Sequence, residues 1–121
     1  MVKYFFDSYA VIEIIKGNKN YAKYVQEEVL LTVFNLVEIY WSALNDLKED
    51  EANEIYDKYK PCIIKISDEI LKEAIKFRKE NKKKDLSYTD CIGYVCALRN
   101  NLVFLTGDNQ FKNMPKVEFV K

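Results

Sequence analysis

The amino-acid sequence predicts an α/β fold, a three-layer α/β/α domain around a mainly parallel sheet of about four to five strands. Two observations support this fold class. Short apolar runs alternate along the 121 residues with helical patterns of about ten residues or more, which is typical of parallel βαβ units. The runs at 2–6, 29–33 and 102–105 are apolar almost throughout, as strands covered by helices on both faces should be.

The expected strands and helices follow one another in order along the chain. Gly17 is expected to stop the first helix, and Asn35 and Ser67 are expected to cap the third and fifth helices. The strands, each a short apolar run, are expected at 2–6, 29–33, 62–66, 102–105 and 117–120. The helices are expected at 8–16, 20–27, 35–47, 49–59, 67–82 and 88–100.

Length and composition limit the class of protein. One domain over residues 1–121 is expected, because this length allows one core and is too short for two. The 19 basic and 19 acidic side chains cancel, which excludes a strongly basic nucleic-acid clamp but not a local basic patch. No apolar run approaches the roughly 20 residues of a membrane span, and residues 1–7 are too short and too soon charged for a signal peptide. We therefore expect a cytoplasmic protein without membrane association.

Missing residue types limit the chemistry. The chain has no histidine, which excludes Ser-His-Asp and Cys-His nucleophile systems and His-ligated zinc. Its 3 glycines lie too far apart to form a phosphate-binding loop. Its 3 cysteines lack Cys-x-x-Cys spacing and indicate buried thiols in a reducing compartment. Any catalysis must therefore use carboxylates, hydroxyls, Lys, Arg or a bound metal.

Four acidic residues that are far apart in the sequence are expected at one end of the sheet. Asp7 follows the first expected strand, and Asp108 follows the fourth. Glu38 is expected in the first turn of the helix after the second strand. The helix that carries Asp90 should run antiparallel to the fourth strand, which returns Asp90 to the carboxyl edge of the sheet. Ligands bind beyond that edge in open parallel sheets.

Each of these acids also has an ordinary local explanation. Asp7 and Asp108 can cap a helix or a turn, and Glu38 and Asp90 each stand three residues after a capping residue, as in a capping box. Asp90 gives the strongest signal for a site. Its helix is apolar nearly all round and should be buried, and no cation lies within one turn of it.

Convergence of the four acids would create repulsion that needs a counter-charge. Two like charges 4 Å apart cost about 4 kcal/mol at an effective dielectric of 20. An all-oxygen site without His or Cys suits Mg²⁺ or Mn²⁺. Such an ion supports phosphodiester hydrolysis without any histidine.

A basic strip precedes the helix that carries Asp90. Residues 77–84 contain five basic residues and one acid. Binding of nucleic-acid phosphates is one interpretation, and a solvated helix end whose cations favour the helix dipole is an equally good one. The candidate phosphate-binding residues are Arg78, Lys82, Lys83 and Lys84.

Three segments resemble the PIN-domain nucleases, in particular the VapC-type toxins of prokaryotic toxin–antitoxin pairs. They are Phe-Phe-Asp-Ser-Tyr-Ala-Val-Ile at 5–12, Asn-Leu-Val-Glu at 35–38, and the stretch 86–111 with Leu-Ser-Tyr-Thr-Asp and Leu-Thr-Gly-Asp-Asn-Gln-Phe. Length and element order also agree, so the resemblance covers essentially the whole chain.

The resemblance implies a PIN-like nuclease domain and a function. It implies a metal-dependent endoribonuclease that cleaves single-stranded RNA, acting as the toxin of a VapBC-type pair. It also implies a homodimer and an antitoxin protein that covers the cleft. The implied metal, Mg²⁺ or Mn²⁺, would be bound by Asp7, Asp90 and Asp108. The implied catalytic set is Asp7, Glu38, Asp90, Thr106 and Asp108.

Two other functions were weighed against this one. A receiver-like phosphoryl-transfer domain would need a second acid beside Asp7 and a Lys after a late strand, whereas Ser8 and Tyr9 follow Asp7 and Asp108 ends the fourth strand. A non-catalytic PIN-like module that binds RNA or protein is the alternative that stays open. It predicts that divalent ions affect neither stability nor RNA cleavage.

Overall fold

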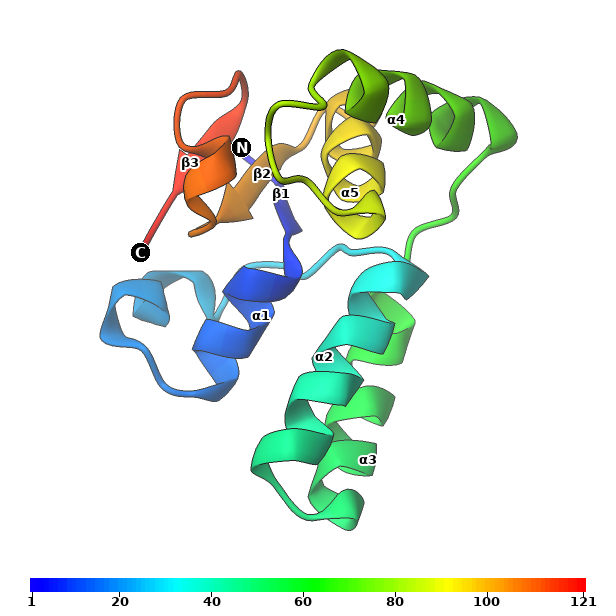
Figure 1. Ribbon diagram of the computed structural model, residues 1–121. Coiled ribbons are helices and arrows are strands. Elements are labelled where there is room, and N and C mark those ends of the chain that lie inside the picture. The colour runs from blue at the N-terminus through cyan, green and yellow to red at the C-terminus, as the bar shows by residue number, and fades with distance from the viewer.

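A three-stranded parallel sheet forms the middle layer of the computed structural model, which describes residues 1–121 (Figure 1). Phe5 of the first strand lies opposite Phe104 of the second, which lies opposite Val117 of the third. All three strands run in the same direction, so their carboxyl ends share one edge of the sheet. In chain order the strands are β1 (Tyr4–Phe6), β2 (Val103–Thr106) and β3 (Val117–Phe119).

The predicted count of four to five strands is too high. The segments 29–33 and 62–66 are not regular strands, and a single parallel bridge between Leu31 and Ile63 joins them. Regular pairing stops there because Thr32 already caps the next helix, and because a short 3-10 turn containing a proline precedes the second segment. Both segments continue the sheet beyond β1 as extended chain only.

Five α-helices and three 3-10 turns surround the sheet. The helix predicted at 20–27 is a 3-10 turn, and the other five predicted helices are present with ends that differ by about two residues or less. No helix combines the length and the apolar character that crossing a membrane requires. The helices are α1 (Ser8–Ile15), α2 (Val33–Asp46), α3 (Glu49–Tyr59), α4 (Asp68–Glu80) and α5 (Tyr88–Arg99), and the turns are η1 (Lys19–Tyr24), η2 (Lys60–Cys62) and η3 (Asn109–Phe111).

The start of α2 differs from the prediction. Thr32, and not Asn35, is the N-cap of α2, and the two residues form a capping box in which Asn35 Oδ1 accepts a hydrogen bond from the Thr32 N–H at 3.1 Å. The helix therefore begins earlier, and Glu38 lies in its second turn. The predicted cap of α4 is confirmed, because the Ser67 hydroxyl accepts a hydrogen bond from the Ile70 N–H at 3.2 Å.

Alternate residues of β1 face different helices, which produces the three layers. Phe5 stacks on Phe104 with ring centroids 5.6 Å apart, and Tyr94 of α5 packs edge-on against Phe104 on that face. On the other face Tyr4 packs edge-on against Tyr24 of η1. Figure 1 shows α5 and α4 on one side of the sheet, α1 on the other, and the α2–α3 pair extending away from it. The predicted α/β class and its layers are confirmed.

Two glycines are required for different reasons. Gly17 follows α1 with φ +79°, a conformation that side chains disfavour, although nothing lies within 4 Å of a Cβ built there. Gly107 follows β2, and a Cβ at this position would collide with the ring of Tyr9 and the carbonyl oxygen of Val120. The close approach at Gly107 packs the C-terminal segment over the end of β2.

Gly107→Ala is expected to lower the free energy of unfolding by about 2 kcal/mol or more, because the added methyl group overpacks a closed space. Gly17→Ala should cost only about 1 kcal/mol, since it strains the backbone and meets no neighbour. Urea unfolding of both variants measures the difference. An equal loss in the two would mean that the space beside Gly107 can open without cost.

Candidate active site

The carboxylate of Asp7 is held at the point where β1 passes into α1. Its side chain caps α1 by accepting a hydrogen bond from the Ser8 N–H at 2.9 Å. Its other oxygen accepts one from the hydroxyl of Thr106, at the end of β2, at 2.7 Å. Asp7 is 4% exposed and Thr106 is fully buried. The two neighbouring strands thus end on the same buried carboxylate, which confirms Asp7 as a cap and places Thr106 beside it.

Glu38 reaches the same region through a side-chain network that starts in α2. The Ser8 hydroxyl donates to Glu38 Oε1 at 2.6 Å and accepts a hydrogen bond from Asn35 Nδ2 at 2.9 Å. Asn35 is fully buried. Ser8 therefore links the carboxylate of α2 to the start of α1. From the sequence Asn35 is expected only as a helix cap, and its contact with the distant Ser8 leaves no signal in the local pattern.

Asp90 and Asp108 each lie at the start of a helical segment near this edge, Asp90 in the first turn of α5 and Asp108 as the N-cap of η3. Asp90 forms the predicted capping box with Ser87, whose N–H donates to Asp90 Oδ2 at 2.9 Å. Asp108 caps η3 by accepting a hydrogen bond from the Gln110 N–H at 2.9 Å. The N–H of Asp108 also donates to the Thr106 hydroxyl at 3.1 Å. Both carboxylates are partly exposed, so the deeply buried acid of the set is Asp7 and not Asp90 as the sequence suggested.

The four acids influence one another and have no cationic partner. Burial raises the pKa of Asp7 to about 7, and the charges of Asp90 and Glu38 add to this effect. Burial also raises the pKa of Asp90, with further contributions from the charges of Asp108 and Glu38. The two salt bridges of the molecule, Lys3–Glu28 and Arg99–Glu73, involve none of these acids. In Figure 1 the end of β1 and the starts of α1, α2 and α5 meet in the middle of the molecule.

The donor set fits a hard divalent cation by its chemistry. It consists of carboxylate oxygens and hydroxyls alone, with negative charge that the protein does not neutralise. As the side chains stand, no three acidic or cysteine residues are grouped closely enough to surround an ion. Their oxygens instead accept hydrogen bonds from the helix starts and from hydroxyl groups. The metal ligands expected from the sequence, Asp7, Asp90 and Asp108, therefore stay a prediction.

A family model described as the PIN domain matches residues 4–117. The chain belongs to the PIN domain family. Among solved structures it is similar to a toxin–antitoxin complex from Klebsiella pneumoniae, with a TM-score of 0.76 and 19% identity over 96% of each chain. It is also similar to VapBC2 from Rickettsia felis bound to a DNA fragment from their promoter, with a TM-score of 0.71 and 18% identity over 100% of each chain.

A third similar structure is FitAcB from Neisseria gonorrhoeae, with a TM-score of 0.68 and 14% identity over 100% of this chain and 97% of that one. At these identities the likeness establishes the fold. None of the curated proteins compared with the chain matches it. The family assignment confirms the predicted resemblance to PIN domains.

A basic hollow of about 400 Å³ lies between the end of α4 and the start of α5 of this PIN domain. Three of the four basic residues selected from the sequence, Arg78, Lys82 and Lys84, line it, and Lys83 does not. Tyr88 also lines the hollow and is not among the residues that the sequence predicts; its position shortly after the basic strip is the signal that points to it. The full lining of the basic hollow is Ile75, Arg78, Lys79, Lys82, Lys84, Asp85, Leu86 and Tyr88.

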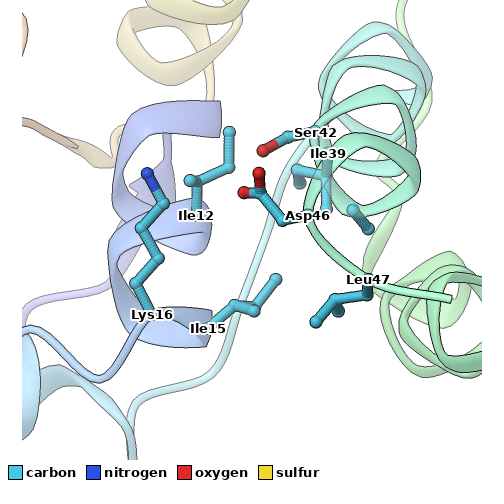
Figure 2. Close-up of a pocket in the computed structure, with 8 residues that line it drawn as sticks. Ile12, Ile15, Lys16, Ile39, Ser42, Asp46 and Leu47 are labelled. Atoms are coloured by element: carbon cyan, nitrogen blue, oxygen red, sulfur yellow. The ribbon is translucent and has the colours of Figure 1, made fainter.

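An apolar groove of about 120 Å³ separates α1 from α2 of the PIN domain. Figure 2 shows Ile12 and Ile15 of α1 facing Leu47 and Asp46 of α2 across it. Lys16 lies on the α1 side (Figure 2). The exposed side chains of Val37, Trp41 and Leu44 share a different face of α2, since they are spaced one helical turn apart and do not line the groove. This groove is distinct from the edge where the four acids lie.

The free energy of unfolding of the parent should fall as the pH rises, and Asp7→Asn should remove this fall. The unfolded chain releases the Asp7 proton near pH 4, whereas the folded protein keeps it to about pH 7. Between these values the unfolded state binds fewer protons, so the parent's free energy of unfolding falls with pH, by about 1.4 kcal/mol per unit of pKa difference. The variant has no such group and should gain on the parent from pH 4 to pH 7. Urea unfolding in chelator measures this, and parallel curves would show that Asp7 titrates normally.

Proposed function

We propose that this PIN domain is a divalent-metal-dependent endoribonuclease that cleaves single-stranded RNA. The observation that supports it best is the set of mutually repelling carboxylates at the carboxyl edge of the sheet, with Asp7 buried beside Asp90 and Glu38 and no cation paired to any of them. Such an arrangement costs stability in the folded protein, and a bound cation offsets the cost. We further propose that residues 1–121 act as a single nuclease unit.

The residues of the site divide the work between holding the ion and activating water. Asp7 and Asp90 would hold Mg²⁺ or Mn²⁺, with Asp108 contributing directly or through a water. When bound, the ion would lower the pKa of water and stabilise negative charge on the phosphate. Thr106 orients the Asp7 carboxylate through its 2.7 Å hydrogen bond. Glu38, oriented by the Ser8 hydroxyl at 2.6 Å, would position or deprotonate the attacking water.

The proposed function also implies a protein partner and a cellular location. We propose that it is the toxin of a VapBC-type pair, working in the cytoplasm as a homodimer under the control of an antitoxin. The similar structures from K. pneumoniae and R. felis, a toxin–antitoxin complex and VapBC2, support the partner. The groove between α1 and α2 and, on another face of α2, the exposed Trp41 supply apolar surface that partner segments would cover.

Metal binding is expected to appear first as a change in stability. Millimolar Mg²⁺ or Mn²⁺ should raise the melting temperature of the parent by several degrees above its value in chelator, because the ion binds only the folded state. Asp90→Asn should melt at or above the parent temperature in chelator, since repulsion is relieved, and should respond much less to metal. Asp57→Asn, an exposed acid of α3, is the matched control and should behave as the parent does. Equal melting temperatures with chelator and metal would count against the proposed ion site.

Cleavage of RNA is the decisive prediction. The parent should cut labelled single-stranded RNA with Mg²⁺ or Mn²⁺ and be inactive in chelator. Asp90→Asn keeps the size of the side chain but removes the charge, so its cleavage should fall to background while Asp57→Asn stays active. Glu38→Gln should lower kcat far more than it lowers metal affinity, because Glu38 acts on water and not on the ion.

The cleavage assay includes structured RNAs and single-stranded DNA beside single-stranded RNA. Activity that survives chelator, or that Asp90→Asn leaves untouched, would come from another site or a contaminant and would overturn the mechanism. A protein that neither responds to metal nor cleaves any member of the panel would instead be the non-catalytic RNA- or protein-binding module. Toxicity on expression that is lost in Asp90→Asn is a second readout when the RNA target is narrow.

A further inference from the structure

The basic hollow has a strong excess of positive charge. Four cations line it against one acid, Asp85. None of these cations is used in a salt bridge, because both salt bridges lie elsewhere. The apolar groove between α1 and α2 is lined by one cation and one acid. The hollow on the far side of α4, which contains Arg99, has as many acids as cations among Glu69, Lys72, Glu73, Lys76, Glu80 and Arg99.

Arg78 and Tyr88 form a fixed pair inside this hollow. The guanidinium carbon of Arg78 lies 4.3 Å from the centroid of the Tyr88 ring. Arg78 Nε donates a hydrogen bond to the carbonyl oxygen of Leu86 at 3.0 Å, which holds the guanidinium plane in place. Its terminal nitrogens donate to no group of the protein. Tyr88 is 60% exposed, so much of its ring is open to solvent.

This pair matches the chemistry of one unpaired nucleotide. The free terminal N–H groups of a guanidinium form a planar fork that fits a phosphate with two hydrogen bonds. An exposed aromatic ring stacks on a base that is not already stacked in a duplex, and such stacking tolerates any base. Lys79 and Lys82 add charge for the backbone phosphates. A double helix would offer phosphates to the hollow but no free base face.

The hollow adjoins the acidic edge through the start of α5. Tyr88 and Asp90 are two residues apart, which places them about 3 Å apart along the helix axis and about 200° apart around it. A nucleic-acid strand that crosses the start of α5 therefore meets the acids on one side of the helix and Tyr88 on the other. The segment between α4 and α5 is also linked to the acids by hydrogen bonds. Lys84 Nζ donates to the carbonyl oxygen of Gln110 at 3.1 Å, and the N–H of Gln110 donates to Asp108.

We propose that the basic hollow is a nucleotide subsite, in which Tyr88 stacks on one unpaired base of the bound nucleic-acid strand and Arg78 binds the phosphate of that nucleotide. The role of the subsite in selecting single-stranded substrate rests on the proposed function. Its binding chemistry does not, because it uses none of the four acids. Tyr88 and Arg78 are binding residues that contact the substrate on the side of α5 away from the four acids.

The test measures binding without cleavage. Fluorescence anisotropy in chelator compares a labelled single-stranded RNA, the same strand in a duplex, and a strand of equal length with abasic positions. Tyr88→Leu should weaken binding of the intact single strand by about tenfold, as loss of one base-stacking contact does. It should leave duplex and abasic binding unchanged, and Tyr88→Phe should bind as the parent does because the ring is kept.

Two further variants separate stacking from charge. Arg78→Lys keeps the charge but loses the fork, so it should weaken binding of the single strand while the salt dependence stays the same. Lys76→Gln removes an exposed cation of α4 that does not line the basic hollow, and it should leave binding of all three RNAs within about twofold of the parent. Thermal melting of each variant reports whether the fold is retained. Tyr88→Leu should melt as the parent does, because Tyr88 is exposed and is not part of the core.

Each outcome bears on one proposal. Unchanged single-strand affinity in Tyr88→Leu overturns the subsite, and so does an equal loss for single-stranded, duplex and abasic RNA, which would leave only a charged surface. A parent that binds none of the three RNAs also overturns it. Tyr88-dependent binding without any metal-dependent cleavage keeps the subsite and refutes the nuclease. Metal-dependent cleavage whose KM is unaffected by Tyr88→Leu keeps the nuclease and refutes the subsite.

Discussion

The site depends on one constraint, the burial of the Asp7 carboxylate without a positive charge beside it. Burial raises its pKa to about 7, so near neutral pH the fold holds a group that is close to half ionised. Its partners are the Ser8 N–H and the Thr106 hydroxyl, both neutral donors. Because Asp7 directly follows β1 and Thr106 is the last residue of β2, the same contact that orients the carboxylate also joins the ends of the two strands.

Neutral donors and cations have different consequences for such a site. An Arg or Lys in contact with Asp7 would lower its pKa and stabilise the fold, but it would also occupy the place and cancel the charge that a metal ion requires. The hydroxyls of Ser8 and Thr106 orient Glu38 and Asp7 without placing a positive charge beside them. A carboxylate can therefore cap a helix and also belong to the site, because the N–H group that it accepts a hydrogen bond from is neutral and brings no counter-charge.

The sequence predicted the order of elements and the edge where the acids lie, because both follow from the alternation of apolar runs and helices. It did not predict the number of strands, because Leu31 pairs once with Ile63 before the Thr32 cap turns the chain into α2. Nor did it predict that Asp7 is buried more deeply than Asp90. Burial of a residue at the end of a strand depends on which helices cover it, and local periodicity does not carry that information.

The start of α5 separates negative from positive charge, a feature that the net charge of zero conceals. Asp90 lies on the side of the acids, and Tyr88 with Arg78 lies on the side of the basic hollow. The two sides are mechanically connected, because Lys84 contacts Gln110, whose N–H positions Asp108. These two hydrogen bonds join the basic hollow to the turn that carries Asp108.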